Sequence, residues 1–135
     1  MKEFFLLLFF LKTTILTSAP VIISTNGIEI IPEKPLKAVT GGAAVYIDVS
    51  VYLKNNSIED IEKKFPEGSV HGKIITYEGK EIELLHQGYS LTGNKMYLII
   101  GGNNPFPTNI DFSKVILFSQ NELQNVFVVW MNGKH

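Results

Sequence analysis

The clearest pattern in the chain is an alternation of apolar and polar residues over positions 43–53. One face of this stretch is apolar and consists of Ala43, Val45, Ile47, Val49, Val51 and Leu53. The opposite face carries Tyr46, Asp48, Ser50 and Tyr52. A period of two is typical of a β-strand with one buried face. The pattern therefore predicts a strand over 43–53 that presents its tyrosines and Asp48 to the outside.

Further apolar runs with turn residues between them fill most of the remaining chain. Such runs lie near 70–86, 96–100, 110–119 and 125–132, and Gly, Asn, Pro or Ser residues separate them. An earlier run at 21–31 contains Asn26-Gly27, the dipeptide that most strongly favours a tight β-hairpin. Residues 21–31 are therefore predicted to fold back as a hairpin.

One short helix is expected, over residues 58–65. Ser57 is placed to cap its first turn, because a serine oxygen at this position accepts a backbone hydrogen bond. Glu59 and Asp60 follow in the first turn, and lysines occupy the last. This order of charges complements the helix dipole.

The pattern as a whole predicts an all-β fold. Roughly seven to nine short strands with frequent turns are typical of an antiparallel two-sheet sandwich of immunoglobulin-like size. A small barrel is the alternative. The 135 residues are enough for one domain. We place that β-sandwich domain at 20–135, after a hydrophobic leader at 1–19.

The leader contains an unbroken apolar run at 4–11, which Lys12 ends. A membrane-spanning helix needs about 20 apolar residues, and a span of that length would contain Lys12 near its middle and Pro20 near its end. A short apolar run followed by small residues, here Thr17 and Ala19, is typical of a cleaved signal peptide. An uncleaved membrane anchor and a helix packed on the domain are the alternatives. The cleaved signal peptide and the uncleaved anchor both predict export, to the outside of the cell or to the periplasm.

Composition narrows the classes of partner. The formal net charge is −1, and all 12 basic residues are lysines. An arginine fork for phosphate is therefore absent, and little in the overall charge attracts nucleic acid. The chain has no cysteine, which excludes disulfides, thiol catalysis and thiolate metal sites.

His71 and His86 lie on the two arms of a predicted hairpin that turns at Glu78 and Gly79. With a two-residue loop the two histidines would face each other and could begin a zinc site. With a three-residue loop, in which Gly79 adopts a left-handed conformation, they would point to opposite faces.

The hydrophobic pattern favours the three-residue loop. That register places Ile74 opposite Ile82 and keeps the apolar residues on one face, whereas the other register mixes Lys73 with apolar neighbours. No metal site is therefore predicted.

Catalytic arrangements have little support. Ser50 and Asp48 could be combined with either histidine, but no spacing such as G-x-S-x-G accompanies them. The glycine pairs lack the strand–glycine–helix context that holds phosphate. We therefore predict no catalytic residues and no cofactor, and we expect the protein not to be an enzyme.

The outward row of Tyr46, Asp48 and Tyr52 is the best candidate for a partner-binding surface. Tyrosine offers a large rigid contact area with a polar tip. The sequence thus predicts an exported protein that binds another protein, as an accessory, inhibitor or immunity-type protein does, through this face or through an unpaired edge strand. Contact with a membrane is expected only through residues 4–19, if they are retained.

A carbohydrate-binding module is the main alternative from another class. It would require two or three exposed, coplanar aromatic rings, for which Trp130 and the tyrosines are the candidates. A small hydrolase and a self-assembling surface component are weaker alternatives, the first because it needs a concave pocket with a nucleophile beside a base.

Overall fold

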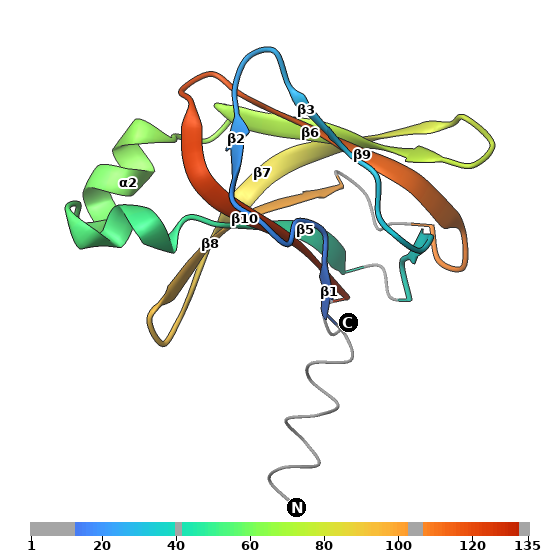
Figure 1. The fold of residues 1–135 in the computed structure, drawn as a ribbon, viewed down its shortest axis with the longest axis horizontal. Coiled ribbons are helices and arrows are strands. Elements are labelled where there is room, and N and C mark those ends of the chain that lie inside the picture. The colour runs from blue at the N-terminus through green and yellow to red at the C-terminus, as the bar shows by residue number, and fades with distance from the viewer. Residues whose placement is uncertain (1–12, 40–41, 103–106, 133–135) are drawn as a thin grey trace, which may run out of the picture.

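Antiparallel β-strands make up most of the molecule (Figure 1). The computed structural model describes residues 13–39, 42–102 and 107–132. Strands account for 55% of the described residues and helices for 11%, which confirms the predicted β-rich class with one short α-helix.

The elements follow one another along the chain with short connections. The strands are β1 (Thr13–Ile15), β2 (Val21–Ile23), β3 (Ile28–Ile30), β4 (Leu36–Lys37), β5 (Ala43–Asp48), β6 (Val70–Thr76), β7 (Glu81–Thr92), β8 (Lys95–Gly102), β9 (Asp111–Ser119) and β10 (Leu123–Asn132). Between β5 and β6 lie the 3₁₀ helix η1 (Ser50–Lys54) and the helix α2 (Ile58–Lys64).

The ten strands form one curled sheet and not the two-sheet sandwich that the sequence suggested. The strand order is β1-β10-β5-β8-β7-β6-β9-β3, with β2 also paired to β10 and β4 to β9. Hydrogen-bonded pairing runs through every neighbour in this order, so the described strands belong to one continuous sheet. Twist accumulates from strand to strand and lets a long sheet curl over its own core.

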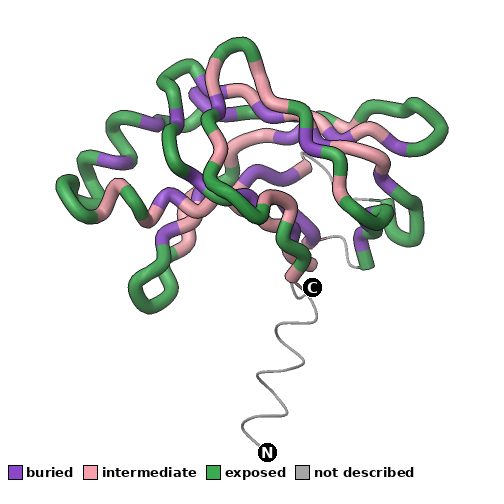
Figure 2. Tube along the Cα trace, in the orientation of Figure 1, coloured by how far each residue is buried: buried purple, intermediate pink, exposed green. Residues whose placement is uncertain are grey.

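The two ends of the sheet meet across the interior. Phe112 of β9 and Trp130 of β10 lie five steps apart in the strand order, yet their ring centroids are 5.7 Å apart at an interplanar angle of 73°. Edge-to-face contact of this kind is favourable for buried aromatic rings. The curl therefore encloses one core, and Figure 2 shows buried segments along the strands with exposed residues at the turns.

The predicted hairpin at 21–31 is wrong, although its turn exists. Gly27 has a φ of +81°, and its N–H donates to the carbonyl of Ser24 at 3.1 Å. The strands on either side do not pair with each other, because Val21 lies opposite Val126 of β10 and Ile28 opposite Leu117 of β9. The turn therefore links the two ends of the curled sheet.

The long strand predicted for 43–53 is confirmed only as far as Asp48. Residues Ser50–Lys54 form η1 instead. The Asp48 carboxylate accepts a hydrogen bond from the Ser50 N–H at 2.9 Å. A short polar side chain that bonds to the backbone two residues further on favours a turn over a continued strand.

The helix prediction is confirmed. The Ser57 hydroxyl accepts from the Asp60 N–H at 3.1 Å, and the Asp60 carboxylate accepts from the Ser57 N–H at 3.3 Å. This reciprocal pair is a capping box that satisfies two backbone donors of the first turn. Ile61 and Phe65 are buried, so α2 packs its apolar side on the core at one end of the curled sheet (Figure 1).

The predicted register of the β6–β7 hairpin is also confirmed. Ile74 lies opposite Ile82 and Lys73 opposite Glu83, and Gly79 has a φ of +87°. Since His71 is opposite Leu85, the neighbouring His86 projects to the other face of the sheet.

The structure includes part of the predicted leader. Residues Thr13–Ile15 form β1, which pairs with β10 and places Ile15 opposite Val129. The apolar run at 4–11 lies outside the described residues, so cleavage at Ala19 stays a prediction. None of the helices within the described ranges has the length and apolar character needed to cross a membrane.

Candidate functional site

Two of the three predicted binding residues lie together on the outer side of the sheet. Tyr46 is opposite Val129 of β10 and Ile99 of β8. Its ring meets the Tyr97 ring edge to face, with centroids 5.8 Å apart and an interplanar angle of 71°. Asp48 is opposite Tyr97, so the tyrosine pair and the carboxylate occupy adjacent positions.

The strand register extends this surface over four strands. Residues directly opposite each other in a sheet share a face. We call the surface the outer tyrosine face; it consists of Ile15, Tyr46, Asp48, Tyr97, Ile99, Phe127, Val129 and Met131. All of them are exposed or partly exposed; Ile15 has 69% and Phe127 38% of its surface exposed. A contiguous apolar surface of this kind commonly marks a site of interaction.

Asp48 supplies the negative charge of this face. Its carboxylate side chain is only 11% exposed and lies 3.2 Å from the Lys95 ammonium. Burial raises the pKa of Tyr97, the Asp48 charge raises it further, and Lys95 opposes the shift. The Tyr97 hydroxyl therefore stays protonated at neutral pH and can donate a hydrogen bond.

Tyr52, the third predicted residue, belongs to another cluster. Its hydroxyl accepts a hydrogen bond from the Gln124 N–H at 2.8 Å, and its ring packs edge to face on Phe65 at 5.5 Å. The Lys64 ammonium lies 5.4 Å from the centroid of the same ring. Because β5 ends at Asp48, Tyr52 lies in η1 and not on the sheet. From η1 it contacts α2 and the start of β10.

Sequence reasoning missed Tyr97, although a signal for it existed. Met96 and Leu98 are both buried, and Tyr97 between them points to the opposite face of β8. The alternation in β8 could have placed it on an outer surface, but only the pairing of β8 with β5 brings it to Tyr46.

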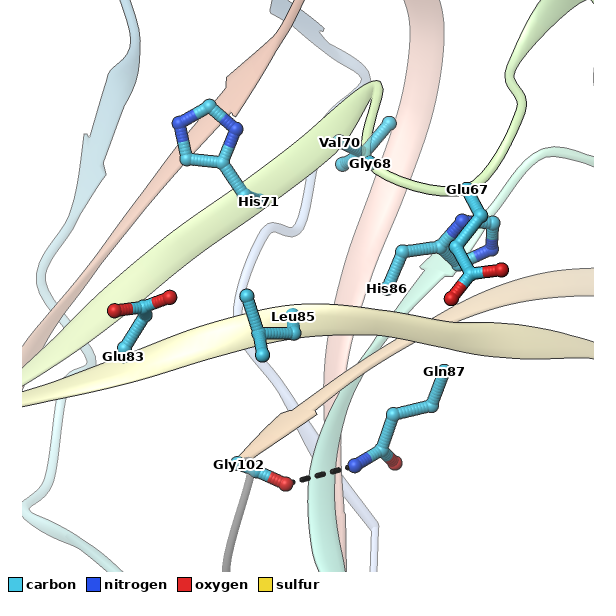
Figure 3. A pocket seen from close by; sticks show the side chains of 9 residues that line it. All are labelled: Glu67, Gly68, Val70, His71, Glu83, Leu85, His86, Gln87 and Gly102. Atoms are coloured by element: carbon cyan, nitrogen blue, oxygen red, sulfur yellow. Dashed lines mark hydrogen bonds between the residues drawn. The ribbon is translucent and has the colours of Figure 1, made fainter.

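Hollows of the described surface lie beside each of the two histidines, and Figure 3 shows the one that both line. A cleft of about 470 Å³ is lined by His71, His86, Glu67 and Glu83 among others. The His71 ring stacks on Phe118, with centroids 5.3 Å apart. Both ring nitrogens of His86 are buried and have no hydrogen-bond partner among the described residues.

The cleft does not assemble a catalytic set. The Ser50 hydroxyl accepts from the Met96 N–H at 2.8 Å, and Asp48 holds the Ser50 N–H. No hydrogen bond joins either residue to a histidine within the described ranges. Among all residues that the structure describes, no group of three or more His, Asp or Glu residues is placed to hold a metal ion.

Tyr89 lies beside this cleft and permits a test by pH. Its hydroxyl donates to the Phe65 carbonyl at 2.6 Å. Burial, followed by the negative charge of Glu62, raises the pKa of Tyr89 from 10.0 to about 12. Because the folded-state pKa lies above the unfolded value, this contribution to stability is complete below pH 10 and is lost as the pH rises towards about 12.

Titration followed by ultraviolet absorbance should therefore show one tyrosine that ionises about two pH units later than an ordinary one. The Tyr89→Phe variant should lack that late transition and keep the others. The raised pKa of Tyr97 should be unaffected, so only a transition near pH 12 that persists in this variant would contradict the assignment.

The site residues predicted from the sequence thus end in three environments. Tyr46 and Asp48 share the outer tyrosine face, Tyr52 packs against α2, and Trp130 is buried in the core.

Comparisons of the chain with protein-family models, with curated proteins and with solved structures find no match.

Proposed function

We propose that this chain is an exported protein that acts by binding another protein through the outer tyrosine face. The observation that supports the proposal most is the contiguous surface of partly exposed apolar and aromatic residues across β10, β5 and β8. Tyrosines at the centre of such a surface serve as rigid anchors in protein interfaces.

The Asp48–Lys95 pair gives the same face a polar component. Asp48 is held by the Ser50 N–H as well as by Lys95, so its carboxylate has a defined position. Lys95 has 60% of its side chain exposed, so its ammonium group can pair with a negatively charged group of a partner. Polar groups at the margin of an apolar contact favour specific pairing.

Export is supported by the sequence of the leader. The apolar run at 4–11 is too short to span a membrane and is followed by the small residues Thr17 and Ala19. Action without catalysis, metal or cofactor is part of the same proposal, with accessory, inhibitor and immunity-type roles as its forms.

The carbohydrate-binding alternative has less support. Stacking on sugars needs exposed rings in one plane, whereas Trp130 is 1% exposed and the rings of Tyr46 and Tyr97 meet at 71°. No observation favours it over a protein partner.

The proposal can be tested by truncating the two tyrosines. The full chain, produced in its native host and recovered with its bound proteins, should lose one specific partner when Tyr46 and Tyr97 are both replaced by alanine. We expect binding to weaken roughly 30-fold, the effect of losing a central aromatic anchor. Binding of the purified partner measured by calorimetry gives the magnitude.

Tyr77→Ala is the matched control, because Tyr77 is 63% exposed at the turn of the β6–β7 hairpin. It should leave partner binding unchanged. If the Tyr46 and Tyr97 double variant folds and still binds with unchanged affinity, the outer tyrosine face is not the contact surface.

A further inference from the structure

We infer that removal of residues 1–19 opens a strand slot along β10 and that the binding partner inserts one of its own strands there. The strand slot is the edge of β10 at residues 128–131, which β1 occupies in the full chain. This inference rests on the export and protein binding proposed above, and it adds how the partner is held.

The N-terminal segment shows that the slot accepts an extended chain. Thr14 lies opposite Trp130 and Ile15 opposite Val129, in antiparallel register. The Val128 carbonyl accepts from the N–H groups of Leu16 at 2.9 Å and Thr17 at 3.2 Å, and the Val128 N–H donates to the Thr17 hydroxyl at 2.9 Å. The backbone of Val128 therefore faces this side of β10.

The other described strands that pair with β10 do not occupy this part of the edge. The N–H and carbonyl of one residue in a strand point to one edge, and those of the next residue point to the other edge. Trp130, two residues after Val128, therefore directs its backbone groups to the same edge as Val128. On the other side, β10 pairs with β5 from Phe127 to Asn132. Along the slot side, β2 pairs with β10 only at Leu123 and Val126. Among the described strands, β1 is the one that pairs with residues 129–131 on this side, so its loss would open this part of the edge.

The segment that fills the slot is peripheral to the core. Thr14 and Ile15 are exposed, and neither is among the buried core residues. Leu16 is partly buried and packs against the core, so cleavage after Ala19 would remove this contact and would also expose backbone donors and acceptors of β10. An unpaired strand edge of this kind is a ready template for another chain.

β1 also defines the chemistry of the strand that would replace it. Thr13, Thr14 and Ile15 are all β-branched, as suits an extended segment. Ile15 lies in one row with Val129 and Tyr46, so an apolar side chain at its position extends the outer tyrosine face. The partner segment should be antiparallel to β10, apolar at the Ile15 position and free of proline opposite Trp130.

The first test is the N-terminus of the protein recovered from the exported fraction of its host. Intact mass and N-terminal sequencing should give a chain that begins at Pro20. A chain that retains residues 13–18 would overturn the inference, because β1 would still fill the strand slot. The tyrosine variants would nevertheless test the outer tyrosine face, so the two proposals fail separately.

The second test adds a synthetic peptide of residues 13–18 to this processed protein. Trp130 is the only tryptophan of the chain and lies opposite Thr14, so its fluorescence should report saturable binding. A peptide with Thr14→Pro lacks a backbone N–H at the central position and should bind roughly tenfold more weakly or worse. The unmodified peptide should also displace the partner.

Equal binding of the two peptides, or no binding of either, would overturn the inference. A processed protein whose mass in solution is that of a dimer, and which the peptide converts to a monomer, would show that a second copy fills the strand slot and would overturn the assignment to a partner protein.

Discussion

Replacement of Trp130 by alanine should lower the free energy of unfolding by about 3–5 kcal/mol, the range for truncating a large buried aromatic residue. Trp130 is 1% exposed, and its ring contacts Phe112 from the opposite end of the strand order. The substitution would therefore remove buried area at the place where β9 and β10 meet across the core, and neighbouring strands cannot close the cavity without breaking their pairing.

The measurement is urea unfolding followed by far-ultraviolet circular dichroism, because the substitution removes the only tryptophan. Phe127→Ala is the matched control: Phe127 also lies on β10 but is 38% exposed on the outer tyrosine face. Its loss should cost about 1 kcal/mol or less. Equal losses for the two variants would contradict a sheet that curls over its core at Trp130.

Replacement of Gly72 by alanine should cost about 1–3 kcal/mol, as overpacking of a filled core does. Gly72 lies in the middle of β6, opposite both Leu84 and Leu117. A Cβ atom here would press on the carbonyl oxygen of Ile116 and would lie 2.8 Å from a methyl carbon of Leu117. The backbone of β9 would have to move, and the β6–β9 pairing with it.

Gly101→Ala provides the contrast that isolates this cause. A Cβ at Gly101 would also meet an obstacle, but that obstacle is the amide group of Gln87 at 2.5 Å. Gln87 is exposed and bonds to the Gly102 carbonyl at 2.9 Å, so its side chain can rotate away at the loss of one hydrogen bond. The Gly101 variant should therefore be less destabilised than the Gly72 variant in the same urea experiment. The reverse order would contradict a backbone clash at Gly72.

Local sequence patterns predicted the elements that depend on neighbours along the chain. The capping box at Ser57 and Asp60 lies within one helical turn, and the register of the β6–β7 hairpin follows from Gly79 and from the match of Ile74 with Ile82. Each of these interactions joins residues close in sequence, so their chemistry can be evaluated without the rest of the molecule.

The same local patterns misled where two signals compete. Alternation continued through 49–53, but Asp48 bonds to the backbone of Ser50 and starts η1. Aspartate is depleted in strands and favours turns, and this signal could have ended the predicted strand at Asp48. With η1 in place, Tyr52 packs on Phe65, and the predicted row of three binding residues becomes a pair.

The sequence by itself determined the β-rich class, the capped helix, the hairpin register and the outward position of Tyr46 and Asp48, because each follows from the period of the side chains or from contacts within a few residues. Only the tertiary structure decided that the strands form one curled sheet, and that Tyr97 lies beside Tyr46. It also decided that the turn at Gly27 connects β2, which pairs with β10, to β3, which pairs with β9. Strand pairing between distant segments depends on burying a common core, and a turn signal such as Asn26-Gly27 specifies the direction of the chain but not its neighbours.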